Sequence, residues 1–186
     1  MEEQVKRRVS KQMMYIAIVS MIMMFAGLTS AYVISMKRED WVSFDLPQAL
    51  YISTVLIMLS SLSFILARKS IKKDKTGQTT IFLITTLIFG LSFIYFQIEG
   101  FNQLREAGLF FVGKGSTVSS SLLVVISFAH LVHVLVGVIV LLVVLFNNLK
   151  NKYSAANALG LEVGGIFWHF VDVLWIFLFL FFYFIR

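Results

Sequence analysis

Residues 163–185 read VGGIFWHFVDVLWIFLFLFFYFI, a nearly continuous apolar run. It is long enough to cross the hydrocarbon core of a bilayer as one helix, which takes about 20 predominantly apolar residues. Two polar side chains interrupt it, His169 and Asp172, and their spacing places them on one face of that helix. Ionisable groups inside a membrane span are costly, so they usually have a partner, a cavity or a function. The stretch therefore predicts a transmembrane helix with a buried polar face.

The rest of the chain has a similar character. Of its 186 residues, 59% are hydrophobic and 14% are charged, whereas soluble domains carry roughly 25% charged residues. The alternation of a transmembrane β-barrel is missing, and helices satisfy their own backbone hydrogen bonds in lipid. We therefore predict an all-α, integral membrane five-helix bundle that forms a single transmembrane domain over residues 1–186. The expected helices cover residues 13–35, 48–67, 80–98, 121–146 and 163–185.

Composition excludes several kinds of function. Cysteine is absent, which excludes disulfides, thiolate metal sites and cysteine nucleophiles. The net charge of +6 could indicate nucleic-acid binding, but the basic residues cluster beside the apolar spans, as expected for membrane orientation. The connecting loops are too short for a catalytic domain outside the membrane, and no nucleotide-binding loop or nucleophile elbow is present.

The distribution of basic residues predicts the orientation. The N-terminal tail and the loops 68–79 and 147–162 hold 4, 5 and 2 Lys or Arg residues, eleven together. The two opposite loops and the C-terminus hold 2, 2 and 1, five together. By the positive-inside rule, the N-terminus is expected in the cytoplasm and the C-terminus on the periplasmic side.

Small residues indicate where helices approach each other closely. The first predicted helix has small residues at the spacing of a tight helix contact, and the second has a serine-rich face. These residues are Ala26, Gly27, Ser30 and Ala31 on the first helix, and Ser60, Ser61 and Ser63 on the second.

All three histidines lie within predicted spans. His130 and His133 share a face of the fourth helix, and His169 lies on the fifth helix with Asp172. Residues of these types allow four interpretations: a haem clamped by imidazoles, a metal site, a proton or solute path, and a polar network that fixes helix packing. Physical reasoning favours the packing network, because three histidines cannot form two axial pairs and no repeats or broken helices indicate a transporter.

Three segments resemble the cytochrome c oxidase subunit III family, in its short five-helix bacterial form. Residues 168–175 match its C-terminal helix signature, W-H-F-V-D-V-x-W, and Glu162 stands where the family has a Glu at the start of that helix. Residues 130–137 resemble H-G-x-H-V-x-x-G without the first Gly. Residues 18–27 resemble I-V-S-E-x-x-x-F-A-G, with Met21 in place of the family Glu.

The resemblance implies a non-redox accessory subunit of a bacterial haem-copper respiratory oxidase in the inner membrane. Such a subunit has no catalytic centre, haem or copper of its own, since these belong to partner subunits. It packs on subunit I, holds phospholipid in a cleft and supports proton uptake and the stability of the oxygen-reducing centre during aerobic electron transport. The implied partners are oxidase subunits I and II, membrane lipids and, at a larger scale, a respiratory supercomplex, with no nucleic acid.

The alternatives are a subunit of a quinol oxidase or nitric oxide reductase and, in a different class, a small proton-coupled transporter. For the oxidase subunit we expect a structural polar network and lipid cleft near the last two helices. Its expected residues are His130, His133, Glu162, Trp168, His169, Asp172 and Trp175. Met21 can neither titrate nor carry a proton, so no role of the family Glu is transferred to it.

Overall fold

The computed structural model describes residues 2–39, 41–110, 113, 116–155 and 157–185. Within them, five helices are long and apolar enough to span a membrane, and no strand forms. The prediction of an all-α, five-helix membrane protein is therefore confirmed. The helices are α1 (Glu2–Ser35), α2 (Gln48–Ile71), α3 (Thr76–Glu106), α4 (Val118–Leu149) and α5 (Leu159–Phe184).

Most helices extend beyond the apolar ranges expected from the sequence. α1 starts at Glu2 and includes the basic residues of the N-terminal tail, and α3 continues past Glu99 to Glu106. Outside the hydrocarbon, charged side chains can remain hydrated, so nothing requires the helix to end where the apolar run ends. The apolar run therefore predicts the membrane-spanning part of a helix, whereas the local sequence determines where the helix begins and ends.

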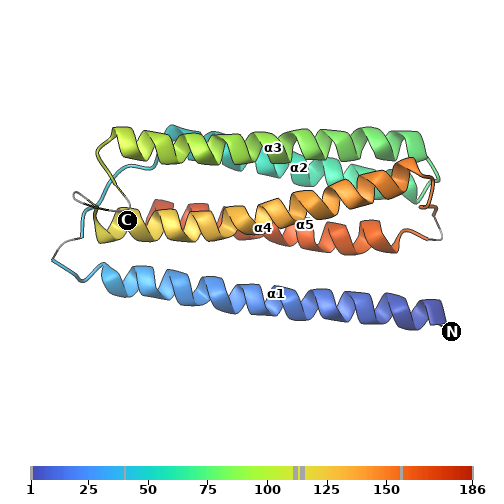
Figure 1. The fold of residues 1–186 in the computed structure, drawn as a ribbon, viewed down its shortest axis with the longest axis horizontal. Coiled ribbons are helices and arrows are strands. Elements are labelled where there is room, and N and C mark those ends of the chain that lie inside the picture. The colour runs from blue at the N-terminus through green and yellow to red at the C-terminus, as the bar shows by residue number, and fades with distance from the viewer. Residues whose placement is uncertain (1, 40, 111–112, 114–115, 156, 186) are drawn as a thin grey trace.

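The helices pack as a bundle in which α1 is the outermost member. α2 and α3 form the most extensive pair, α4 and α5 pack beside them, and α1 contacts only α4 and α5 (Figure 1). The N-terminus and the C-terminus lie at opposite ends of the bundle (Figure 1). Which end faces the cytoplasm stays a prediction from the basic residues.

The small residues of α1 and α2 have different surroundings. On α2, the Ser60 hydroxyl donates to the Thr86 carbonyl at 3.3 Å and the Ser63 hydroxyl to the Phe82 carbonyl at 2.9 Å, which joins α2 to α3. On α1, the predicted contact face is exposed, and a Cβ added at Gly27 would meet no atom within 4 Å. Within this chain, only the α2 face is used for close packing.

The loops at the N-terminal end of the bundle are tied to each other. Asp74, in the turn between α2 and α3, has a left-handed backbone with a φ of 54°. Its carboxylate accepts a hydrogen bond of 2.7 Å from the backbone N–H of Ala155, in the loop between α4 and α5. This contact holds the two loops together beside the start of α5.

Candidate functional site

Trp168 of the α5 signature is closely surrounded by other helices. Its indole lies between two glycines, Gly90 on α3 and Gly137 on α4. A Cβ at these positions would lie 2.8 Å and 3.2 Å from the ring. Its Nε1–H donates to the Ser60 hydroxyl of α2 at 3.1 Å. Trp168 thus joins α5 to three other helices, and the two glycines make room for it.

Trp175 lies two helical turns further along α5 and is fully buried. Its Nε1–H donates to the Thr54 hydroxyl of α2 at 3.0 Å. Its ring centroid lies 5.3 Å from that of Phe93 and 5.1 Å from that of His130. Both tryptophans of the signature therefore donate to hydroxyl groups on α2, which fixes the position of α5 along and around its axis.

His169 is also connected to α2. Its Nδ1 lies 2.7 Å from the Ser61 hydroxyl, and the edge of its ring meets Phe64 with centroids 5.5 Å apart. It lies within electrostatic range of Arg68 at the end of α2. The sequence indicated that the serines of α2 permit close packing; the structure shows that they also bind the polar side chains of α5.

Asp172 is buried, with 2% of its surface exposed. In the described part of the chain, neither of its carboxyl oxygens has a hydrogen-bond partner. Ser61 lies near Asp172, and its hydroxyl oxygen is 2.7 Å from His169 Nδ1. His169 and Asp172 share a face of α5 without binding each other, so the carboxyl group is a buried polar group inside the bundle.

His130 and His133 lie among aromatic rings rather than among carboxylates. His130 is fully buried, and neither ring nitrogen has a hydrogen-bond partner in the described residues. Phe25, Phe93 and Trp175 surround it, with centroids 6.3, 5.9 and 5.1 Å away. His133 Nδ1 lies 2.7 Å from the Ala129 carbonyl, and its ring meets Phe25 at 5.7 Å. Through Phe25, these histidines are in contact with α1.

Glu162 lies in the first turn of α5, where the helix dipole favours a carboxylate. One oxygen lies 2.5 Å from the Arg7 guanidinium, and the other lies 2.7 Å from the Lys11 ammonium. Arg7 and Lys11 are one turn apart on α1, so together they bind both oxygens. Glu162 was predicted to join the histidines in one network, whereas in the structure its partners are these two cations of α1. Their spacing on one helix face was the available signal.

Met21 lies on α1 with 9% of its surface exposed and belongs to the main apolar core together with Phe25 and Trp175. The position where the family has a Glu is therefore filled here by an apolar side chain in apolar surroundings. Among the described residues, no group of three His, Asp or Glu side chains is placed to hold a metal ion.

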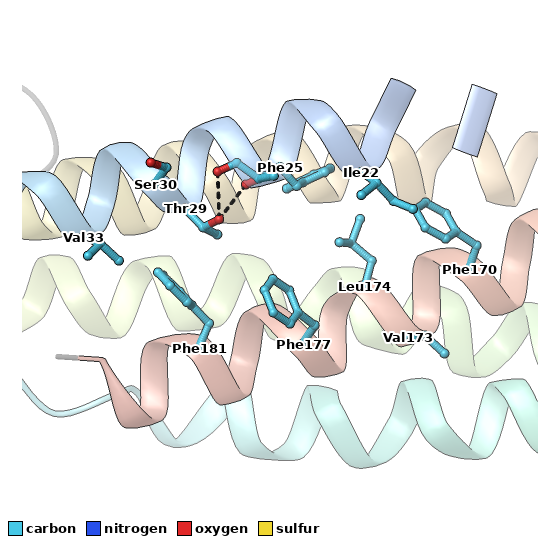
Figure 2. Close-up of a pocket in the computed structure, with 11 residues that line it drawn as sticks. Ile22, Phe25, Thr29, Ser30, Val33, Phe170, Val173, Leu174, Phe177 and Phe181 are labelled. Atoms are coloured by element: carbon cyan, nitrogen blue, oxygen red, sulfur yellow. Dashed lines mark hydrogen bonds between the residues drawn. The ribbon is translucent and has the colours of Figure 1, made fainter. Parts of the chain in front are cut away.

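An apolar cleft of about 640 Å³ separates part of α1 from α5 (Figure 2). Thr29 and Ser30 bring hydroxyl groups to it from α1, and that of Thr29 donates to the carbonyls of Phe25 and Ala26 at 2.9 and 3.2 Å. Phenylalanines of α5 form much of the opposite wall. The lining residues are Ile22, Phe25, Ala26, Thr29, Ser30, Val33, Phe170, Val173, Leu174, Phe177 and Phe181.

These features define a polytopic α-helical membrane protein whose last helix is fastened to its neighbours through buried tryptophans and histidines. Residues 3–186 match the family model described as cytochrome c oxidase subunit III, and the chain belongs to this family.

Relatives named cytochrome c oxidase subunit 3 include bacterial and animal proteins. The protein of Corynebacterium diphtheriae is 32% identical over 89% of this chain and 82% of its own length. That of Alkalihalophilus pseudofirmus is 30% identical over 83% of this chain and 73% of its own length. The match to the Drosophila melanogaster protein, at 33% identity, covers 75% of this chain and 51% of that protein. These matches support an oxidase subunit III role, in a complex with the other oxidase subunits.

Proposed function

We propose that this chain is the non-redox accessory subunit III of a bacterial haem-copper oxidase in the inner membrane. It packs against subunit I, which holds the oxygen-reducing centre, in a complex that also contains subunit II. The N-terminus lies in the cytoplasm. Its relatives are named as subunits of cytochrome c oxidases, which favours a cytochrome over a quinol as the electron donor of the complex.

This proposal rests on the hydrogen bonds that the signature residues of α5 form with α2. Trp168, His169 and Trp175 are each hydrogen-bonded to a hydroxyl group of α2, at 3.1, 2.7 and 3.0 Å. Buried polar groups that are satisfied in this way fix one packing arrangement of the helices. Side chains engaged like this support a role in shaping the subunit rather than in catalysing a reaction.

The cleft between α1 and α5 supports phospholipid binding. Its walls are formed mainly by aliphatic and phenylalanine side chains (Figure 2). The Thr29 hydroxyl already donates to the Phe25 carbonyl, so it does not require a polar ligand. An acyl chain suits such a lining, since it requires no hydrogen-bond partner.

An indirect contribution to proton uptake fits the residues better than direct proton transfer. Met21 offers no titratable group at the position of the family Glu, and the aromatic rings around His130 offer no proton acceptor. The subunit would then support proton uptake by stabilising the adjoining surface of subunit I and the lipid between the two chains.

The test compares the purified oxidase complex with the same complex after removal of this chain. We expect unchanged haem spectra and a similar initial rate of oxygen reduction, followed by faster loss of activity during continuous turnover without the chain. Adding the chain back should restore the lifetime. Loss of haem or copper in proportion to the chain removed would contradict a non-redox role.

A further inference from the structure

A small basic pocket lies at the C-terminal end of α2, on a surface separate from the cleft between α1 and α5. It has a volume of about 220 Å³ and is lined by Ile65, Arg68, Lys69 and Lys72. Among the described residues, Glu162 forms ion pairs with Arg7 and Lys11, and no ion pair involves Arg68, Lys69 or Lys72. The three cations of the pocket therefore have no carboxylate partner there.

Arg68 is held in place by a contact with α5. Its side chain is half-buried, and a Cβ added at Gly165 would lie 3.2 Å from Arg68 Cδ. The stem of the arginine therefore lies against the bare backbone of α5, which restricts the positions of the guanidinium. A restricted guanidinium loses less conformational freedom when it binds an oxyanion, and its planar fork suits a phosphate.

The basic pocket continues an exposed apolar stripe on the same face of α2. The residues recur alternately every three and four positions, the spacing of one helix face. All of the stripe residues are exposed: Val55, Met58, Leu62 and Ile65, followed by Lys69 and Lys72. From Val55 to Ile65 the helix rises ~15 Å, which is about half of a hydrocarbon core of about 30 Å. An apolar stripe as long as one leaflet thus ends in a cluster of cations.

We propose that this surface binds one anionic phospholipid. Its phosphate lies in the pocket between Arg68, Lys69 and Lys72, and its acyl chains run along the stripe from Ile65 to Val55. The charge of the three cations favours an anionic lipid over a zwitterionic one of the same chain length, and the length of the stripe favours a lipid over free phosphate. Basic pockets beside transmembrane helices recognise lipid headgroups through this chemistry.

The test uses the intact oxidase complex carrying this chain, exchanged into phosphatidylcholine-containing mixed micelles. Phosphatidylglycerol with the same acyl chains is titrated in, and native mass spectrometry counts the lipids bound. The variant is K69Q/K72Q, and the matched control is K73Q/K75Q, which removes two lysines from the adjacent turn outside the pocket. Both pairs are exposed, so the fold should survive both changes.

We expect K69Q/K72Q to weaken phosphatidylglycerol binding about 25-fold at one site, given about fivefold for each of the two cations removed. The control should bind as the wild type does, and millimolar inorganic phosphate should not displace the lipid. Arg68→Gln should weaken binding further, while Arg68→Lys should retain part of it. Equal loss in both lysine variants, no loss in either, or displacement by inorganic phosphate would each overturn the proposal.

Discussion

At the scale of single residues, Asp172 differs from the other polar residues of α5. Trp168, His169 and Trp175 have partners on α2, whereas neither oxygen of the Asp172 carboxyl has one in the described residues. An unpartnered carboxyl group inside a membrane protein is costly. We infer that a buried water completes its hydrogen bonds, and that the packing of α5 stabilised in this way shapes the surface that meets subunit I.

Asp172→Ala should therefore loosen association with subunit I more than it slows the chemistry. A lost hydrogen bond of ~1 kcal/mol corresponds to about fivefold weaker association. The measurement is the amount of subunit I that co-purifies with the tagged chain, together with the turnover of the complexes that remain intact. Glu106→Ala, at an exposed position of α3, is the control. Unchanged co-purification with halved turnover would show that Asp172 acts on the reaction instead.

Met21 provides a second test at this scale. Because Met21 lies in the main apolar core, Met21→Glu would place a carboxyl group among predominantly apolar side chains. We expect no increase in the number of protons pumped per electron, measured as acidification outside liposomes that contain the complex. Met21→Gln has a similar shape and does not titrate, so the two variants should behave alike. A clear gain in pumping with Glu alone would restore a direct proton role to this position.

At the scale of helices, the close contacts around Trp168 determine how α3, α4 and α5 fit together. A Cβ at Gly90 would come within 2.8 Å of the rigid indole, whereas a Cβ at Gly27 on α1 would meet nothing within 4 Å. Overpacking typically costs about 1–3 kcal/mol, while Gly to Ala in an exposed helix gains up to about 1 kcal/mol.

Gly90→Ala should therefore lower the thermal midpoint of the isolated chain, and Gly27→Ala should leave it unchanged or raise it slightly. Thermal unfolding in mild detergent, followed by tryptophan fluorescence, measures both. Equal midpoints for the two variants would mean that the indole moves without cost and that the glycines are not needed to accommodate it.

The outermost helix depends on its ion pairs with α5. Arg7 and Lys11 both bind Glu162, at an end of α1 where residues 4–9 are exposed. Glu162→Gln should speed amide hydrogen exchange in the first three turns of α1 severalfold, since partly exposed ion pairs contribute up to ~1 kcal/mol. High salt should reproduce part of the effect in the wild type, and Glu106→Gln serves as the control. Exchange that is unchanged in Glu162→Gln would mean that apolar contacts alone hold this end.

The sequence predicted the helices better than it predicted their contacts. Length and hydropathy are properties of single segments, so the five spans could be found without knowing the neighbours of each helix. The predicted network required those neighbours: Glu162 faces α1, and His169 faces Ser61 of α2, which lies 108 positions away in sequence. The small residues of α1 were expected to form a close helix contact, but within this chain they are exposed. Small side chains permit a close approach without specifying which helix makes it.

At the scale of the whole molecule, the bundle is shaped for association. Its tryptophans and histidines are used internally, while the small-residue face of α1 and the apolar cleft beside it remain open to another chain or to lipid. A small face of this kind allows another transmembrane helix to pack closely. The chain has five helices able to span a membrane and belongs to the cytochrome c oxidase subunit III family. Both findings indicate that it is part of an oxidase complex.

The central proposal is that this chain is a non-redox subunit attached to a haem-copper oxidase. The most direct measurement is affinity purification of the tagged chain from membranes in mild detergent, with visible spectra and protein mass spectrometry of the eluate. We predict co-elution with haem-bearing subunit I and with subunit II, and no visible haem absorption of the chain after stringent separation from them. Elution as an oligomer of this chain alone, without a haem protein, would contradict the proposal.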